Sequence, residues 1–354
     1  MKHLNSVFYT HQRSVFFMSL ICSLMVFLFF TGCGSSHSGS KPNPPIDLTA
    51  TAGGGSEQVA LVWLPSNSYA AGDHPSAIAI DKSGNVWVAD DIYSSSNTVT
   101  ELSPTGTTMG TYNVGSASTA IAIDKSGNIW VANYWNESVT KLSSIGITIG
   151  TYAAGSYPWD IAIDNSGNVW VVNNIFERTG TVTKLNPTGT IMGTYTVGLN
   201  PVGIAIDKSN NVWVTNYSGN TVTELNTTGI TVGTYAVGTN PAGIAIDSSG
   251  NIWVVNSYDG TVTKLSPAGT IIGTYRDPNN PYMNTSPRGI AIDRSNNIWI
   301  TDVPNNNVIE LNSNGKTIGT YGVGVYPAGI AIDGSGHIWV ANTGSNTVTK
   351  LNAN

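Results

Sequence analysis

A short alternation of apolar runs and polar turns repeats along the chain from about residue 71 onward. In residues 243–256, GIAIDSSGNIWVVN, two apolar runs flank a polar turn that starts at Asp247. The Asp recurs at Asp81, Asp124, Asp164, Asp207, Asp247, Asp293 and Asp333, and a Trp follows each copy six residues later, at Trp87, Trp130, Trp170, Trp213, Trp253, Trp299 and Trp339. A spacing of 40 to 46 residues between copies is typical of a repeat architecture.

Each copy of the repeat predicts four short strands. The segments of the type IAI, NIWVVN, TVTKL and TIIGTY are rich in β-branched and aromatic residues and are bounded by turn residues. We name them strands a, b, c and d. Four antiparallel strands in each unit, repeated around a ring, predict an all-β fold, a seven-bladed β-propeller of four-stranded blades. The propeller spans 71–354, with units that start near residues 71, 115, 155, 198, 238, 287 and 324.

The seventh unit stops after its strand c, at Asn354, and an open blade would expose an unpaired edge. Residues 46–70 resemble the first two strands of a fibronectin type III domain but are too few for that sandwich. We therefore expect this N-terminal fragment to close the last blade. The strand expected to do so is 58–64, with Trp63 replacing the Tyr that ends the other d strands.

The polar turn between strands a and b is interpreted as structural. Its fourth position is Gly in five units and Asn at Asn210 and Asn296, and these two residue types enter the left-handed backbone region at low cost. Asp and Ser side chains bond nearby backbone N–H groups in such turns. A calcium site is disfavoured because each copy supplies a single carboxylate.

The N-terminal segment predicts export and lipidation. Residues 1–32 combine Lys2 and Arg13 with an apolar run and are interpreted as a lipoprotein signal peptide. The sequence Thr-Gly-Cys that ends at Cys33 resembles a bacterial lipobox, in which the Cys is lipidated. Residues 33–45 would be a Gly/Ser/Pro linker. The expected location is the bacterial cell envelope, anchored to the membrane through Cys33, on the periplasmic side of the outer membrane or at the cell surface; an uncleaved N-terminal membrane anchor is the alternative.

Composition narrows the function classes. Only 10% of the 354 residues are charged, the net charge is −6, and no basic run is present, which argues against a nucleic-acid partner. The two cysteines, Cys22 and Cys33, both lie in the N-terminal segment, so the repeats hold no disulfide, thiolate metal site or cysteine nucleophile.

The loops of the two propeller faces differ in variability. The a–b and c–d turns, expected on one face, are nearly uniform, whereas the b–c and d–a loops, expected on the other, vary and carry large or charged residues. Variable loops on a rigid scaffold commonly carry binding residues, although solvated drift is the alternative for each position. The candidate binding residues are Tyr93, Tyr134, Trp135, Glu137, Phe176, Glu177, Arg178, Trp159, Asp160, Tyr217, Tyr258, Tyr282 and Arg288.

The repeat P-x-G-I-A-I-D-x-S-G-N-I-W-V-x-N…N-T-V-T-K-L…G resembles NHL-type propellers and the streptogramin B (virginiamycin B) lyase family over residues 71–354. That resemblance implies seven blades and a carbon–oxygen lyase that uses Mg²⁺ with His and Glu residues to open a cyclic depsipeptide at its ester linkage. The histidines do not carry over. His3, His11 and His37 lie in the N-terminal segment, His337 replaces a hairpin Asn, and His74 is alone on the variable face.

We therefore expect a non-catalytic module, without metal or cofactor, that binds a protein, peptide or glycan on the b–c/d–a face. A lyase-like or hydrolytic activity at the same face, with His74, Glu137 or Glu177 as the base, is the alternative. A structural envelope protein without any ligand is a third possibility.

Overall fold

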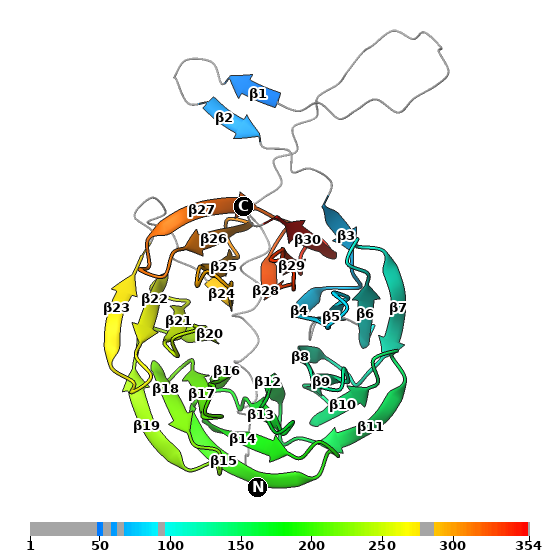
Figure 1. The fold of residues 1–354 in the computed structure, drawn as a ribbon, viewed down its shortest axis with the longest axis vertical. Coiled ribbons are helices and arrows are strands. Elements are labelled where there is room, and N and C mark those ends of the chain that lie inside the picture. The colour runs from blue at the N-terminus through cyan, green and yellow to red at the C-terminus, as the bar shows by residue number, and fades with distance from the viewer. Residues whose placement is uncertain (1–47, 52–57, 62–66, 91–95, 277–286, 353–354) are drawn as a thin grey trace, which may run out of the picture. The chain divides into compact units, whose positions relative to one another are not determined.

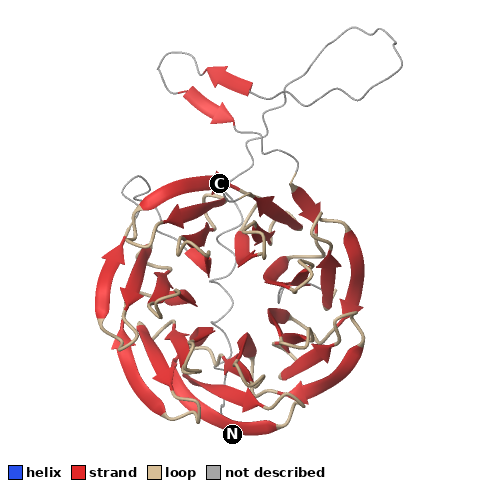
Figure 2. Cartoon of the chain, viewed as in Figure 1, coloured by secondary structure: helices blue, strands red, loops and turns tan. Residues whose placement is uncertain are grey.

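The computed structural model describes residues 48–51, 58–61 and 67–352, except 91–95 and 277–286. The predicted signal peptide, Cys33, the linker, Trp63, Tyr93 and Tyr282 lie outside these residues. The described part contains strands and no helix, and seven four-stranded sheets surround a central channel (Figures 1 and 2). The predicted seven-bladed propeller is confirmed.

Within each blade the strands run antiparallel from the channel outward in the order a, b, c, d. The a strands are β4 (Pro75–Ile80), β8 (Ser118–Ile123), β12 (Pro158–Ile163), β16 (Pro201–Ile206), β20 (Pro241–Ile246), β24 (Pro287–Ile292) and β28 (Pro327–Ile332). The b strands are β5 (Val86–Asp90), β9 (Ile129–Asn133), β13 (Val169–Asn173), β17 (Val212–Asn216), β21 (Ile252–Asn256), β25 (Ile298–Asp302) and β29 (Ile338–Asn342). The c strands are β6 (Thr98–Leu102), β10 (Ser138–Leu142), β14 (Thr179–Leu185), β18 (Thr221–Leu225), β22 (Thr261–Leu265), β26 (Asn307–Leu311) and β30 (Thr347–Leu351). The d strands are β7 (Thr108–Asn113), β11 (Thr148–Ala153), β15 (Ile191–Leu199), β19 (Thr231–Ala236), β23 (Ile271–Tyr275), β27 (Thr317–Gly322) and, in the seventh blade, β3 (Ser68–Ala70).

An N-terminal strand from the fragment 46–70 closes the last blade, as predicted. The prediction that this strand is 58–64 is wrong. Strand β3 pairs with β30, whereas β2 (Gln58–Leu61) pairs with β1 (Leu48–Thr51) in a separate two-stranded sheet. Tyr69 of β3 lies 5.9 Å from the ring of Trp339. A Cβ added at Gly106 in the c–d turn of blade 1 would lie 2.1 Å from the Tyr69 ring, so Tyr69 packs directly on that turn. Tyr69 therefore takes the place that the d-strand Tyr occupies in the other blades.

The core lies between the blades. The seven repeat tryptophans are fully buried, and each packs against apolar residues of the next blade. Each also contacts a d-strand Tyr, for example Trp87 with Tyr112 at 5.3 Å and Trp213 with Tyr235 at 5.5 Å between ring centroids. The blades are therefore joined mainly by aromatic and aliphatic contacts.

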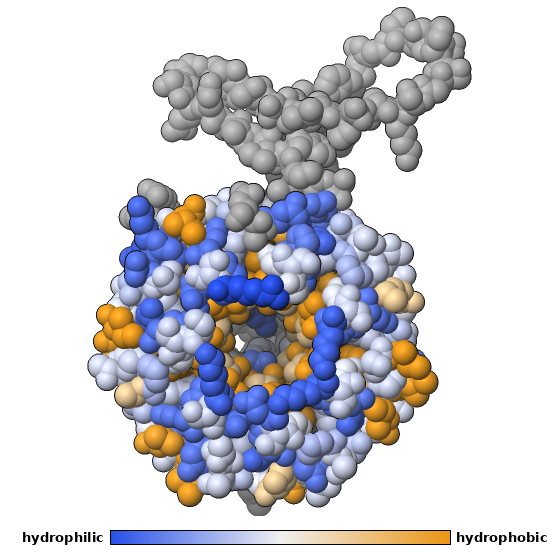
Figure 3. Space-filling model, viewed as in Figure 1, coloured by the Kyte–Doolittle hydropathy of each residue, from blue (hydrophilic) through white to orange (hydrophobic). Residues whose placement is uncertain are grey.

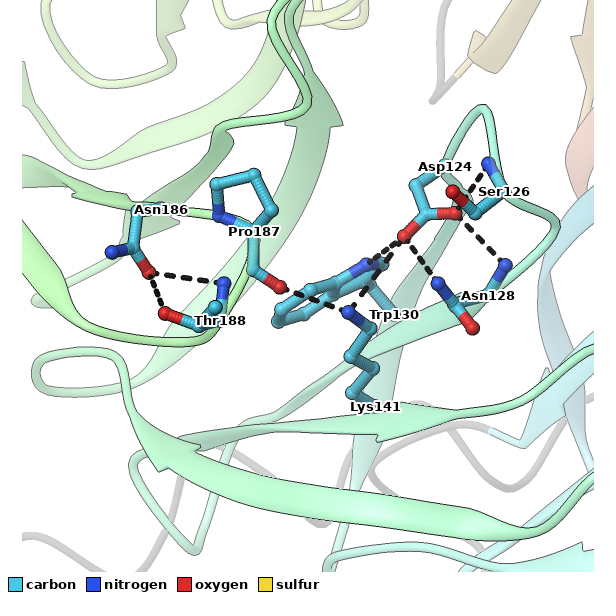
Figure 4. Close-up of polar contacts among 8 residues, drawn as sticks. All are labelled: Asp124, Ser126, Asn128, Trp130, Lys141, Asn186, Pro187 and Thr188. Atoms are coloured by element: carbon cyan, nitrogen blue, oxygen red, sulfur yellow. Dashed lines mark hydrogen bonds and ion pairs between the residues drawn. The ribbon is translucent and has the colours of Figure 1, made fainter.

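The repeated Asp holds its hairpin, as predicted (Figure 4). One carboxylate oxygen of Asp124 accepts the backbone N–H groups of Ser126 and Asn128, both at 2.9 Å. The other accepts the Asn128 side-chain amide at 2.9 Å and the indole N–H of Trp130 at 3.1 Å. The left-handed backbone at the fourth turn position is also present, with φ of 84° at Gly250 and 66° at Asn210.

The two faces have the predicted loop sets. The b–c and d–a loops bond each other, as from Tyr134 N–H to the Ala117 carbonyl at 2.8 Å.

Hydrophilic side chains surround the channel mouth in Figure 3, while apolar side chains lie at the outer edge, where d-strand residues such as Ile149 and Met192 are exposed. Among the described residues, no helix is long and apolar enough to span a bilayer.

Candidate ligand-binding site

The inner strands of all seven blades enclose a cavity of about 520 Å³ at the centre of the ring. Most lining residues are small or aliphatic, and four larger or charged candidate residues join them, namely Trp159, Asp160, Tyr217 and Arg288. Trp159 and Asp160 follow Pro158, which pairs with Asn173 at the b–c end of its blade. This part of the cavity therefore opens toward the variable face, and its volume suits a small ligand or part of a peptide.

Four aromatic side chains from blades 2 and 3 meet beside this opening, and we name them the aromatic cluster: Tyr134, Trp135, Tyr157 and Trp159. Tyr134 is central, with ring centroids 4.8 Å from Trp135, 5.1 Å from Tyr157 and 5.7 Å from Trp159. Trp135 is 59% exposed although it packs on these rings. A large apolar surface that the fold leaves in water is available to a ligand.

Tyr157 holds a backbone conformation that its side chain does not favour. Its φ is 56°, and the same d–a position is also left-handed in the other described blades, where it is Asn200, Asn240, His74, Ala117 or Tyr326. Asn tolerates this left-handed region, while a bulky residue is strained there.

We expect Tyr157→Asn to change the free energy of unfolding by no more than about 1 kcal/mol, because relief of backbone strain offsets the lost ring contacts. Tyr235→Asn is the matched control, since Tyr235 is a d-strand residue stacked on Trp213. It should cost about 3 to 5 kcal/mol, as for the truncation of a buried aromatic. Urea unfolding of both variants measures the difference, and equal large losses would show that Tyr157 is retained for stability.

Asp160 joins blades 3 and 4 at the cavity wall. Its carboxylate accepts its neighbour's N–H, from Ile161, at 2.8 Å and the N–H of Ile204 in the next blade at 3.0 Å. Burial in the wall of the ring raises the pKa of Asp160 to about 7, although the two backbone N–H groups act in the opposite direction. The side chain therefore takes up a proton near neutral pH, where an ordinary aspartate stays ionised.

The other blades have Gly or Ala where blade 3 has Asp160. A Cβ added at Gly243 would lie 2.4 Å from the carbonyl oxygen of Arg288, so the backbones of these blades approach too closely for a side chain there. At the junction of blades 3 and 4, the Asp160 carboxylate lies where the backbones of blades 5 and 6 contact each other directly. Blade 3 thus carries a distinct inner wall next to the aromatic cluster.

Glu137 and Glu177 lie toward the ends of two b–c loops, but the residue of blade 3 that matches Glu137 is Gly180, three residues after Glu177. Both are exposed and have left-handed backbones, with φ of 50° and 54°. At the position of Glu137 four other blades have Asn, and each Asn accepts a backbone N–H of the following d–a loop, as Asn220 does from Asn240 at 2.9 Å. Within the described residues no such bond involves Glu137 or Glu177. Their carboxylates are exposed to solvent on the variable face.

The remaining candidate residues lie apart from the cavity. Phe176 and Tyr258 are 74% and 70% exposed on the b–c loops of blades 3 and 5, and Arg178 is exposed beside Glu177. None of the three lines the cavity. Loop variability alone therefore did not separate channel residues from peripheral ones.

Sequence reasoning missed Tyr157 and the cavity residue Ser257. Ser257 donates a hydrogen bond of 2.7 Å to the Pro287 carbonyl in the next blade and is buried. Comparison of the residue before each strand a does not single out Tyr157, because blade 7 has Tyr326 at that position.

The histidines are paired with nearby carboxylates. His74 Nδ1 lies 2.8 Å from Asp73 on the variable face, and His337 Nδ1 lies 2.9 Å from Asp333 in an a–b hairpin. In the described part of the chain, no three His, Cys, Asp or Glu side chains are grouped so that they could hold a metal ion. These residues therefore do not fit the Mg²⁺ site that the family resemblance implied.

A family model described as the virginiamycin B lyase family matches residues 66–351. A solved streptogramin B lyase superposes with a TM-score of 0.71 at 22% identity, over 80% of this chain and 94% of that one. A catalytically inactive histidine-to-alanine variant of virginiamycin B lyase from Staphylococcus aureus with quinupristin gives 0.70 at 20% identity, over 82% and 97%. Hydrazine synthase of Kuenenia stuttgartiensis gives 0.70 at 15%, over 79% and 96%. No curated relative matches the chain. At these identities the structural likenesses support the fold alone.

Proposed function

This chain belongs to the virginiamycin B lyase family, and from that premise we propose that it is a non-catalytic member that binds a peptide at the aromatic cluster and the adjoining channel mouth. The observation that carries the proposal is the aromatic cluster itself, with Trp135 59% exposed beside a cavity of about 520 Å³. Trp and Tyr supply most of the binding energy in many interfaces. A peptide is favoured over a glycan because the S. aureus relative is described with quinupristin.

The alternative is a carbon–oxygen lyase or hydrolase at the same face, which family membership favours. A metal-assisted elimination needs a metal and a base with an orienting neighbour. His74 has Asp73 as its neighbour, and Glu177 is exposed, but the described residues assemble no metal-holding group around either. The residues present therefore support binding better than catalysis.

We expect Trp135→Ala to weaken quinupristin binding, measured by isothermal titration calorimetry, by about tenfold or more, because the exposed indole face is lost. Phe176→Ala is the matched control, since Phe176 is an exposed aromatic residue on the b–c loop of the next blade, outside the aromatic cluster. It should leave the affinity unchanged. Absence of binding, or equal affinity of Trp135→Ala and wild type, would contradict the proposal.

The same samples decide between binding and lyase activity. Quinupristin incubated with the protein and Mg²⁺ is expected to remain intact by mass spectrometry. Metal-dependent opening of the ring that is lost in His74→Ala or Glu177→Gln would establish the enzyme instead.

We also propose that the propeller acts in the bacterial cell envelope, attached to the membrane through lipidated Cys33. This proposal rests on the sequence of residues 1–45. A tether of this kind would present the binding face to ligands outside the cytoplasm.

A further inference from the structure

The charges of the two propeller faces differ in kind. Among the described residues, all eight lysines and Arg294 lie in or next to the a–b hairpins and c–d turns. The b–c/d–a face has no lysine in that part of the chain; it carries seven carboxylates against three arginines, Arg178, Arg276 and Arg288. The face with the aromatic cluster is therefore the more acidic one.

The fold itself shows how it holds an ammonium group, in the site drawn in Figure 4. Lys141 Nζ lies 4.6 Å from the ring centroid of Trp130 and 3.9 Å from a carboxylate oxygen of Asp124. It donates a hydrogen bond of 2.8 Å to the carbonyl of Pro187 in the next blade. An indole face, a carboxylate and a carbonyl together satisfy the cation, and Lys264 repeats the arrangement over Trp253 at 4.6 Å.

The aromatic cluster offers the same groups without a lysine of its own. Trp135 exposes its indole, and Glu137 follows it two residues later on the same b–c loop. The carbonyl of Glu137 accepts the N–H of Ala154, which places this loop against the d–a loop of Tyr157. Asp160 adds a second carboxylate where Trp159 lines the cavity. Two indoles and two carboxylates are thus present at this junction, Trp159 and Asp160 in the cavity wall and Trp135 and Glu137 on the b–c loop of blade 2.

The position of Glu137 argues that its charge is retained for a ligand. Four equivalent residues are Asn, which tolerates the left-handed backbone and caps the next loop, and the other two are Gly180 and Gly260. Glu adopts this left-handed conformation at a higher energetic cost than Asn. Among the described residues, its side chain also accepts no hydrogen bond from the backbone N–H of Tyr157. A carboxylate that does not cap the next loop is expected to interact with a ligand.

From this arrangement we propose that the aromatic cluster, Glu137 and Asp160 form a receptor for a cation, the ammonium group of a lysine side chain or N-terminus in the bound peptide. This inference rests on the proposed peptide-binding function. The indoles contact the apolar stem and the ammonium, and Glu137 balances its charge. Arg288 lines the same cavity as Trp159 and Asp160, and Arg178 lies on the b–c loop of blade 3, but neither belongs to the cluster.

The test compares two probes of equal shape, N-acetyl-lysine methylamide and N-acetyl-norleucine methylamide, titrated into the full-length protein. The readout is the indole N–H signal of Trp135 in ¹H–¹⁵N NMR spectra, assigned through Trp135→Phe. We expect the lysine probe to bind about tenfold more tightly than the neutral probe, and the difference to shrink as salt is raised. Glu137→Gln should remove most of the preference.

Glu177→Gln is the matched control, because Glu177 is an exposed glutamate on the b–c loop of blade 3 with nearly the same φ and lies outside the aromatic cluster. It should keep the preference for the lysine probe. Equal affinity for the two probes, with both still dependent on Trp135, would overturn the cation inference and leave the binding site standing. A stronger shift of Trp135 by methyl β-glucoside would replace it with a glycan ligand. If neither probe nor glucoside shifts Trp135, the proposed function fails as well.

Discussion

A chain that begins at residue 72 should lose the stable propeller, whereas a chain that begins at residue 67 should keep it. The two differ by Asn67, β3 and Ala71, and β3 is the outer strand of the seventh blade. Without it, β30 exposes a row of unpaired backbone groups, and Trp339 loses the ring of Tyr69 at 5.9 Å. The backbone bond from Lys350 N–H to the Asn67 carbonyl at 2.8 Å is also lost.

The expected loss is on the order of 5 kcal/mol, since removal of one buried aromatic side chain alone costs about 3 to 5 kcal/mol. This is a large share of the stability of a typical domain. Thermal and urea unfolding of the two chains measure it, and Tyr69→Ala in the longer chain isolates the aromatic part. If the chain that begins at residue 72 unfolds at the same urea concentration as the longer one, β3 does not close the ring.

The second large effect is expected for Asp247→Ala, which should lower the free energy of unfolding by about 2 to 4 kcal/mol. Asp247 is 5% exposed and accepts four hydrogen bonds, two from backbone N–H groups and two from the side chains of Asn251 and Trp253. The substitution leaves the buried indole N–H of Trp253 without an acceptor. Ser248→Ala on the same hairpin is the control, because Ser248 is exposed and contributes only its backbone to hydrogen bonds.

The effect should also depend on pH. Burial alone would raise the pKa of Asp247, but the bonds from Asn251 and Trp253 and the charge of Lys264 lower it below its ordinary value of 3.8. A lowered pKa in the folded state means that this carboxylate stabilises the fold above pH 3.8 and that its contribution is lost as the pH falls further. The wild type and Asp247→Ala should therefore converge in stability in acid. A difference that stays constant between neutral pH and acid would contradict the ionic role.

Much of the fold could be predicted because it depends on local chemistry repeated seven times. Asp247 and Trp253 are six residues apart, and their bond, like the left-handed turn at Gly250, is decided within one hairpin. Because the repeat occurs seven times, positions that depart from it, such as Trp159 and Asp160, could be identified as candidate site residues.

The closing strand was misassigned because closure is decided by packing between segments far apart in the chain. The stretch 58–64 is the more apolar one, but the strand that fits is the one whose Tyr69 reaches both Trp339 and the c–d turn at Gly106. Tyr157 could not be predicted as a site residue for the same reason. Its importance comes from contact with Tyr134 of the preceding blade, which no local pattern reports.

Pairing of β3 with β30 also sets an order of events during synthesis. Each blade from the first to the sixth is a run of consecutive strands, so its hairpins can form as soon as they leave the ribosome. The seventh blade cannot, because its outer strand is made first and its partner is made last. Ring closure is therefore expected to be the final and slowest folding step.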